Sequence, residues 1–157
     1  MDPLWHELTN GFPDRDRLVI VLLRVFAAVL LGAVVGIERE QAGKPAGLRT
    51  HMLVSLGTAV VVIACQDAAM SLDGLSRVIQ GIVTGIGFIG AGTILKLNEQ
   101  REIQGLTSAA GLWMTAAIGV AAGLGILGLA VIGTVVTLLI LVLEQVIEAR
   151  KNKQNKN

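Results

Sequence analysis

The sequence predicts an all-α membrane protein with five transmembrane helices. Of its 157 residues, 53% are hydrophobic and only 16% are charged, and the mean hydropathy is +0.68. Charged and turn-forming residues gather between five apolar runs. The first run, residues 18–37, is long enough to cross a bilayer core of about 30 Å at about 1.5 Å per residue. This composition is typical of a multi-pass membrane protein, and a net charge of +1 argues against nucleic-acid binding.

The chain divides into three predicted segments. Residues 1–17 form an outer N-terminal segment, residues 18–143 a five-helix transmembrane domain, and residues 144–157 a basic cytoplasmic tail. The first segment mixes acidic residues with arginines, and the apolar run after it is too long for a secretory signal. We therefore expect the first run to remain in the protein as a membrane helix.

The first predicted helix, residues 18–37, contains one charged residue, Arg24. Ala28, Gly32 and Gly36 follow Arg24 at four-residue intervals, so the arginine lies on the small-residue side of this helix. That side would point Arg24 into the bundle. Because Arg24 is close to the start of the run, its side chain could instead reach the nearer headgroups. Both alternatives stay open from the sequence.

Glycines dominate the third run, residues 78–95, which contains the stretch GIVTGIGFIGAGTILK. On a helix the glycines fall on two faces, one with Gly81, Gly85 and Gly92 and the other with Gly87 and Gly90. Small residues let helices approach closely in lipid, so we expect a central helix with neighbours on both sides. The GxGxxG within the stretch does not indicate a nucleotide site, because no turn interrupts the apolar run.

The other runs predict helices at residues 50–66, 106–122 and 124–143, with a polar loop at 98–104. The fourth helix has a ridge of small residues that would pack against the third: Thr107, Gly111, Thr115, Gly119 and Gly123. The second half of the fifth helix is expected to face lipid. The predicted helix-packing glycines are Gly32, Gly36, Gly81, Gly85, Gly87, Gly90, Gly92, Gly111, Gly119 and Gly123. Leucine at either Gly85 or Gly119 is expected to disrupt packing.

The distribution of lysine and arginine predicts the orientation. Nine of the 13 lie in the first loop, the third loop and the tail, three lie on the opposite side, and Arg24 lies within a span. We therefore expect the N-terminus outside and the C-terminus in the cytoplasm.

Polar residues gather where four helices end on the predicted cytoplasmic side. This cluster comprises Glu38, Arg39, Glu40, Arg49, Thr50, His51, Lys96, Thr107 and Ser108. Glu38 and Arg49 are the expected ion pair. The cluster is either a set of interface ion pairs that fix loop geometry or a site for a ligand or partner. His51 is either a capping residue or, because of its ordinary titration range, a switch.

The residue types of metal and catalytic sites are sparse. Cys65 is the one cysteine, which excludes an internal disulfide and a cysteine zinc cluster; it is either a small buried residue or an intermolecular bridge. The apolar runs contain neither Asp nor Glu, which leaves Glu38 and Glu40 as weak candidates for a metal site. The serines lack the GxSxG context of a hydrolase. We predict no enzymatic activity and no cofactor, with Mg²⁺ left open as a ligand.

Four motifs occur in order between about residues 24 and 125: GAVVGIERE, KPAGLRTHMLVSLG, GIGFIGAGTILK and GLTSAAGLWMTAAIGVAAGLG. Together they resemble the membrane domain of the MgtC/SapB family. The resemblance implies a five-span protein of the bacterial inner membrane, linked to magnesium homeostasis and growth at low magnesium and, in pathogens, to survival inside host cells. Some members of that family are thought to bind and restrain the membrane ATP synthase.

The chain departs from the family pattern at two places. Ser108 stands where many members have a second threonine, which retains the hydroxyl. Many members also continue into a soluble C-terminal domain, whereas this chain ends at a basic tail, so we expect that domain's contribution to be missing.

Two functions from different classes follow from these observations. The first is a non-enzymatic regulator that acts by contacting another membrane complex, such as the ATP synthase, from the lipid bilayer. The alternative is a transporter of magnesium or another cation, which would need a polar path through the bundle. Self-association into a homodimer through the small-residue ridges is a further expectation.

Overall fold

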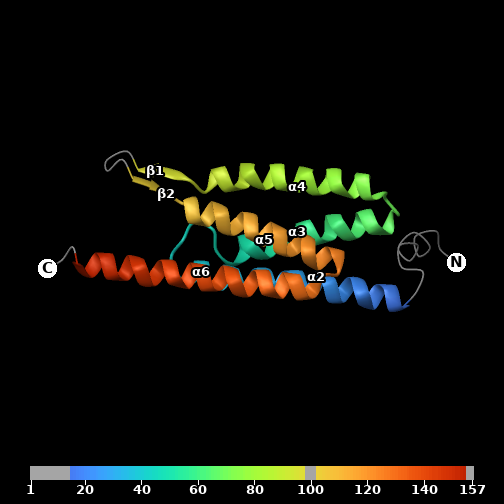
Figure 1. Ribbon diagram of the computed structural model, residues 1–157, viewed down its shortest axis with the longest axis horizontal. Helices are drawn as coiled ribbons and strands as arrows, with labels where there is room; N and C mark the ends of the chain where they lie inside the picture. Colours follow the sequence, from blue (N-terminus) through green and yellow to red (C-terminus); the bar gives the residue numbers. More distant parts are fainter. Residues whose placement is uncertain (1–14, 98–101, 155–157) are drawn as a thin grey trace.

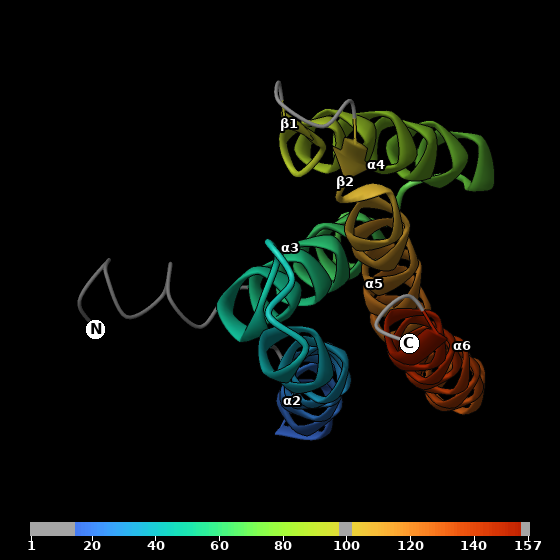
Figure 2. The same ribbon diagram turned by 90° about the vertical axis from the view of Figure 1, so that its left-hand side faces the viewer.

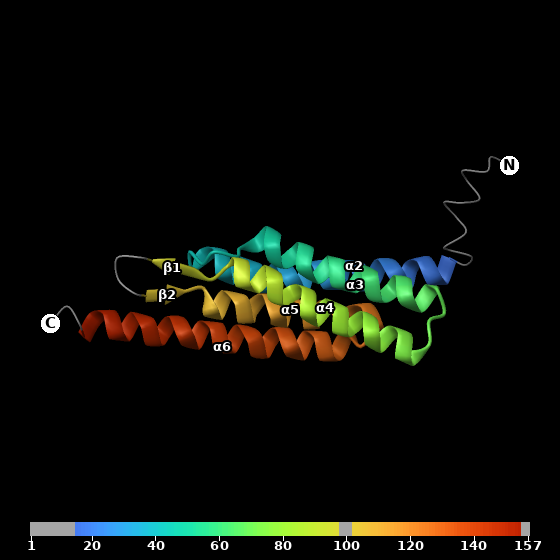
Figure 3. The ribbon, with the colours of Figure 1, turned by 90° about the horizontal axis from the view of Figure 1, so that it is seen from above.

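The computed structural model describes residues 15–97 and 102–154, without the side chains of 95–97, 102–104 and 147–154. Within this part of the chain, five helices are long and apolar enough to cross a membrane, which confirms the predicted fold class. They are α2 (Arg15–Gln41), α3 (Leu48–Asp67), α4 (Leu72–Gly92), α5 (Leu106–Leu124) and α6 (Leu127–Gln154). The helices lie side by side along one long axis (Figures 1 and 3). Their orientation in the membrane stays a prediction.

Helix α5 is the centre of the bundle. In the end view of Figure 2, α5 lies between α3, α4 and α6, and it also contacts α2. In the most apolar window of each helix, 56% of α5 is buried but only 11% of α4. The expectation that the glycine-rich third helix is central is therefore wrong. Glycines on two faces make a helix able to accept close neighbours, but they do not determine which helices of the same chain supply them.

Close approach through glycine occurs where α2, α3 and α5 meet. A Cβ on Gly32 would lie 2.7 Å from the His51 carbonyl oxygen, and one on Gly36 would lie 2.7 Å from the Leu48 Cα. A Cβ on Gly123 would likewise lie 2.7 Å from the Ala59 carbonyl oxygen. Gly119 is tighter still, because a Cβ there would overlap Ser55 and Thr58. The chain can bring these helices together only with glycine at these positions.

We call the region where α2, α3 and α5 meet the central seam. Its apolar side chains are small: Ala28, Ala59 and Ala122 are all fully buried. Such residues let the backbones pack closely, so the seam is narrow and leaves few gaps between helices.

Two segments differ from the predicted boundaries. Part of the predicted 98–104 loop is a short antiparallel hairpin, in which β1 (Leu95–Leu97) pairs with β2 (Glu102–Gln104). The left-handed Gly105 (φ +95°) then turns the chain into α5. At the other end of the chain, α6 continues as helix to Gln154, so the predicted tail begins as an extension of the last membrane helix.

Candidate functional site

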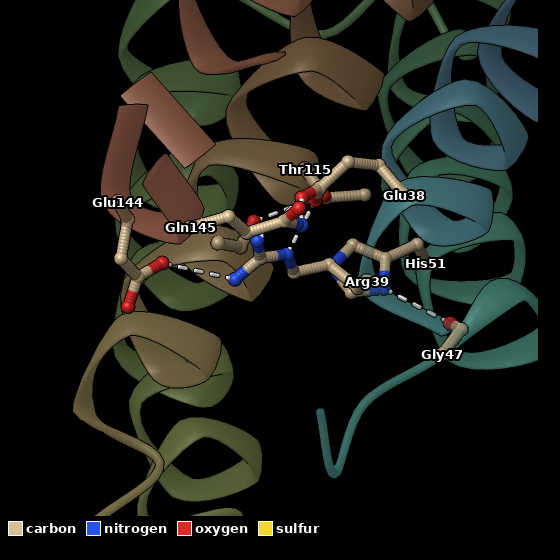
Figure 4. Close-up of polar contacts among 8 residues, drawn as sticks. Glu38, Arg39, Gly47, His51, Thr115, Glu144 and Gln145 are labelled. Atoms are coloured by element: carbon tan, nitrogen blue, oxygen red, sulfur yellow. Dashed lines mark hydrogen bonds and ion pairs between the residues drawn. The ribbon is translucent and has the colours of Figure 1, made fainter. Parts of the chain in front are cut away.

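The polar site lies at one end of the central seam and is built around Arg39, which is fully buried. We call this the Arg39 end. The guanidinium donates two hydrogen bonds to the Glu38 carboxylate, at 2.5 and 2.6 Å, and one to Glu144 Oε2 on α6, at 3.2 Å. The Gln145 side-chain amide also donates to Glu38 (Figure 4). One buried cation thus joins two carboxylates and ties α2 to α6.

The three charged side chains of this network are joined by direct ion pairs and together carry a net negative charge. One arginine and two carboxylates sum to −1, and the glutamates keep some contact with the outside, with side chains 13% (Glu38) and 22% (Glu144) exposed. The buried cation is tolerated because each of its three nitrogens donates to a carboxylate oxygen. Removing one partner would leave an uncompensated buried charge. This lowers stability more than replacing the whole ion pair with apolar residues.

The expected pair between Glu38 and Arg49 is wrong. Glu38 instead pairs with its neighbour Arg39 and with Gln145, whereas Arg49 lies exposed on α3. The sequence reasoning missed Glu144 and Gln145, because it assigned them to the tail. A signal for them existed in the buried positions of α6, which recur at helical spacing through Thr134, Thr137 and Leu141 and reach 144 and 145 next.

His51 lies beside this network, fully buried on α3. Its Nδ1 is 3.0 Å from the Gly47 carbonyl oxygen. A carbonyl only accepts, so the neutral ring carries its proton on Nδ1 and leaves Nε2 as a bare acceptor. Nε2 has no partner among the described residues and faces α5 at Gly111, where a Cβ would lie 3.7 Å away. His51 therefore adds a second hydrogen bond to the Gly47 carbonyl, which already accepts the His51 backbone N–H at 3.2 Å, and it does not cap the free N–H groups at the start of α3.

Two buried hydroxyls near the seam are also unsatisfied among the described residues. Ser55 Oγ on α3 and Ser108 Oγ on α5 have no hydrogen-bond partner. Thr58 and Thr115 differ, because each hydroxyl donates to a carbonyl in the preceding turn of its own helix. The seam at the Arg39 end is therefore polar but not fully hydrogen-bonded.

The other members of the predicted cluster do not join Arg39. Glu40 accepts the Leu48 backbone N–H at 2.8 Å and so caps the start of α3. Thr50 and Thr107 are half-buried, and Thr107 lines a groove between α5 and α6. Lys96 lies in β1, and its side chain is outside the described part. The structure thus brings together Glu38 and Arg39, with His51 beside them, whereas Ser108 is buried in the first turn of α5 and Glu40 serves α3 separately.

Arg24 marks the opposite end of the seam. Its Nη1 donates to Gln66 Oε1 at 2.7 Å and to the Gly123 carbonyl oxygen at 2.9 Å. The guanidinium also fills the space beside Gly125, where a Cβ would lie 2.5 Å from Nη2. Of the two alternatives for Arg24, the inward orientation is the one the structure has. Arg24 joins α2, α3 and α5 at the end where Arg17 pairs with Asp67.

Packed apolar residues separate the two polar ends. Along the seam, Ala28, Ala59, Val62 and Ala122 are fully buried between the Arg24 contacts and the hydroxyls of Thr58 and Thr115. We call these four residues the apolar layer. The described residues therefore do not line a continuous polar path from one end of the seam to the other.

The weak metal candidates already have other partners. Glu38 is engaged by Arg39 and Gln145, and Glu40 by the α3 backbone. Among the described residues no group of three His, Cys, Asp or Glu side chains could hold a metal ion. A cation that approached the Arg39 end would find the carboxylates of Glu38 and Glu144 already bonded to Arg39.

The fold and this site define a multi-pass membrane protein with an ion-paired end. The MgtC family model matches residues 25–150, and the chain belongs to the MgtC family. No solved structure matches it.

Three curated relatives illustrate the similarity. Protein SrpB of Synechococcus elongatus is 42% identical over 129 residues, covering 75% of this chain and 71% of SrpB. The "Putative magnesium transporter YhiD" of Escherichia coli is 46% identical over 128 residues, 77% of this chain and 58% of YhiD. Protein MgtC of Salmonella typhimurium is 41% identical over 125 residues, 80% of this chain and 52% of MgtC. The match thus spans little more than half of YhiD and MgtC, and none of these three names is that of an enzyme.

Proposed function

We propose that this protein is a non-enzymatic regulator in magnesium-linked physiology that acts by contacting another membrane complex. The observation that carries the proposal is the apolar layer, which closes the seam between its two polar ends. An ion crossing this layer would lose its hydration without finding replacement oxygens, which is prohibitively costly for a divalent cation.

The ion-paired Arg39 end supports the same function. Arg39 ties α2 to α6 through Glu144, so opening this end requires separating a buried cation from its carboxylates. Rigid ends suit a protein that presents a fixed surface to a partner. The kind of partner, a membrane complex such as the ATP synthase, comes from the family resemblance.

Transport of magnesium is the second candidate. It is favoured by the name of the relative YhiD, a putative magnesium transporter, and by the net negative charge of the Arg39 network. For transport, the apolar layer would have to part during the cycle and Glu38 would have to exchange Arg39 for the ion.

Magnesium flux into liposomes that contain the purified protein separates the two functions. We expect flux equal to that of protein-free liposomes, because the apolar layer closes the seam. Glu38→Gln and Glu40→Gln form a matched pair, since each removes one carboxylate charge from the end of α2 but only the first touches Arg39. Saturable flux that Glu38→Gln abolishes and Glu40→Gln retains would overturn the regulator function. Circular dichroism and monodispersity of each variant show that it is folded.

A positive test of the regulator uses crosslinking in living cells under magnesium limitation. A photoreactive residue at exposed Arg49 on the Arg39 end is expected to capture a discrete membrane protein. Capture of lipid alone from this end and from lipid-facing positions on α6 would contradict the proposal.

A further inference from the structure

The outer helix α4 turns its apolar side inward. Ile79, Ile82 and Ile86 point toward α5 and α3, where they line the spaces beside Trp113 and Val54. The opposite side, which spans about 140° of the helix, is exposed and made mostly of polar and small residues. These residues are Asp73, Arg77, Gln80, Gly81, Thr84, Gly87, Phe88, Ala91 and Gly92. We call this surface the outward face of α4; Phe88 is its one large apolar residue, 85% exposed.

The outward surfaces of α2 and α6 have the opposite character. Large apolar side chains such as Phe26, Leu30, Ile132, Leu139 and Ile140 are each about 60% exposed there. These are the residues that lipid tails accommodate. Since all of these helices would cross the same bilayer, lipid contact explains the surfaces of α2 and α6 but not the outward face of α4 (Figure 2).

Gln80 is a polar residue of the outward face of α4 whose exposure to lipid would cost free energy. Gln80 is the third residue of the apolar run 78–95, so at about 1.5 Å per residue it lies about 3 Å inside the edge of the bilayer core. Its side-chain amide is exposed and has no partner among the described residues, since the bond from Thr84 goes to its backbone carbonyl. An amide facing lipid without a hydrogen bond is unfavourable. A second helix that offers a donor and an acceptor at this depth would satisfy the amide in place of water or headgroups.

A second copy of this chain satisfies these requirements. A glutamine amide is both donor and acceptor, so two Gln80 side chains at the same depth can pair with each other. Asp73 and Arg77 lie one turn apart on the same face and carry opposite charges. In a parallel pair the long Arg77 side chain of each copy can therefore reach diagonally, across about 6 Å of depth, to Asp73 of the other copy. Two copies inserted in the same direction place α4 parallel to α4 and equal residues at equal depth.

Gly81 lies at the right place for the contact. A Cβ on Gly81 would meet nothing within 4 Å, so this copy does not use the glycine for its own packing. Between Gln80 and Thr84 on the same face, Gly81 lets a second helix approach to backbone distance, which strengthens an interhelical hydrogen bond.

We propose that the outward face of α4 is the interface of a two-fold symmetric homodimer, in which the α4 helices run parallel, Gln80 pairs across the axis and Asp73 meets Arg77 of the second copy. The axis lies along the membrane normal. The proposal is independent of the regulator function, because a contact through α4 leaves uncovered α2 and α6, which carry the Arg39 network.

Cysteine crosslinking in native membranes tests the geometry. In a Cys65→Ala background, which removes the one native, buried cysteine, Gly81→Cys is expected to form a disulfide-linked dimer on oxidation with copper phenanthroline. Ile132→Cys is the matched control, because it is exposed in the membrane span of α6 and not on the outward face of α4. Equal crosslinking of both variants, or a Gly81→Cys product that contains a different protein, would overturn the homodimer.

The energetics are tested with the full chain in liposomes, by energy transfer between labelled copies as the protein is diluted in lipid. Gln80→Leu is expected to weaken association by about tenfold, the size of one interhelical hydrogen bond in lipid. Gly81→Leu is expected to abolish dimers, whereas Gly128→Leu, at an open glycine of α6, leaves them unchanged. Monomeric wild-type protein at every dilution would overturn the proposal.

A charge exchange distinguishes a second copy from any other occupant. Asp73→Arg places like charges opposite each other and is expected to weaken the dimer a few-fold. The double variant Asp73→Arg/Arg77→Asp is expected to restore it, because a self-paired face regains both contacts. A partner of different sequence would lose both contacts, so failure of the double variant to recover would contradict self-association.

Discussion

The central seam and the outer helix α4 use the same kind of residue in opposite ways. Gly32, Gly36 and Gly119 in the seam all meet a neighbouring helix, while Gly81 and Gly85 on α4 meet nothing within 4 Å. All of these glycines occur at four-residue spacings in apolar runs. Small residues allow a helix to pack closely against another helix. Whether that contact forms within one copy of the chain depends on the rest of the fold.

The largest expected effect contrasts Gly119 with Gly85. Gly119→Leu is expected to prevent folding, or to lower the free energy of unfolding by more than about 3 kcal/mol, because its Cβ would overlap Ser55 and Thr58. Gly85→Leu is expected to change the stability of one copy by less than about 0.5 kcal/mol. Thermal unfolding in detergent measures both. Comparable losses would mean that α4 is packed as tightly as the seam.

The next effect contrasts a buried arginine with an exposed one. Arg39→Ala is expected to lower the free energy of unfolding by about 3–5 kcal/mol, because Glu38 and Glu144 lose their buried cation. Arg77→Ala on α4 should cost one copy less than about 0.5 kcal/mol. Denaturant titration of each variant at a dilution where the protein is monomeric gives the two values. A small loss for Arg39→Ala would show that the Arg39 end is not held by this network.

The smallest effect concerns hydroxyls. Ser108→Ala is expected to leave stability unchanged or to raise it by up to about 1 kcal/mol, since the buried Ser108 hydroxyl has no partner among the described residues. Thr84→Ala on α4 should change the stability of a monomer by less than about 0.5 kcal/mol, because Thr84 is exposed. The same unfolding measurements apply. A clear loss for Ser108→Ala would mean that Ser108 holds a bridging water.

The candidate site was only partly predictable. Glu38, Arg39 and His51 follow from polar residues at the ends of apolar runs, because charges collect where helices leave the membrane. Glu144 and Gln145 did not follow, since they lie about a hundred residues away and become partners only when α6 packs beside α2. The pairing of Glu38 with Arg39 was equally hidden. Adjacent helical residues point in different directions, and only the long arginine side chain, confined by burial, folds back.

The sequence by itself determined that this is a five-helix membrane protein of the MgtC family. Run length and hydropathy are local properties, and they determine whether a segment can span the bilayer. It also marked Arg24, Gly32, Gly36 and Gly119 as residues of a packed face. Only the tertiary structure decided that α5 is central, that Arg39 joins Glu144, and that α4 turns polar residues outward. The physical reason is that lipid tails and apolar helix faces are alike, so in a membrane the choice of neighbour depends on shape and on a few polar contacts between distant segments.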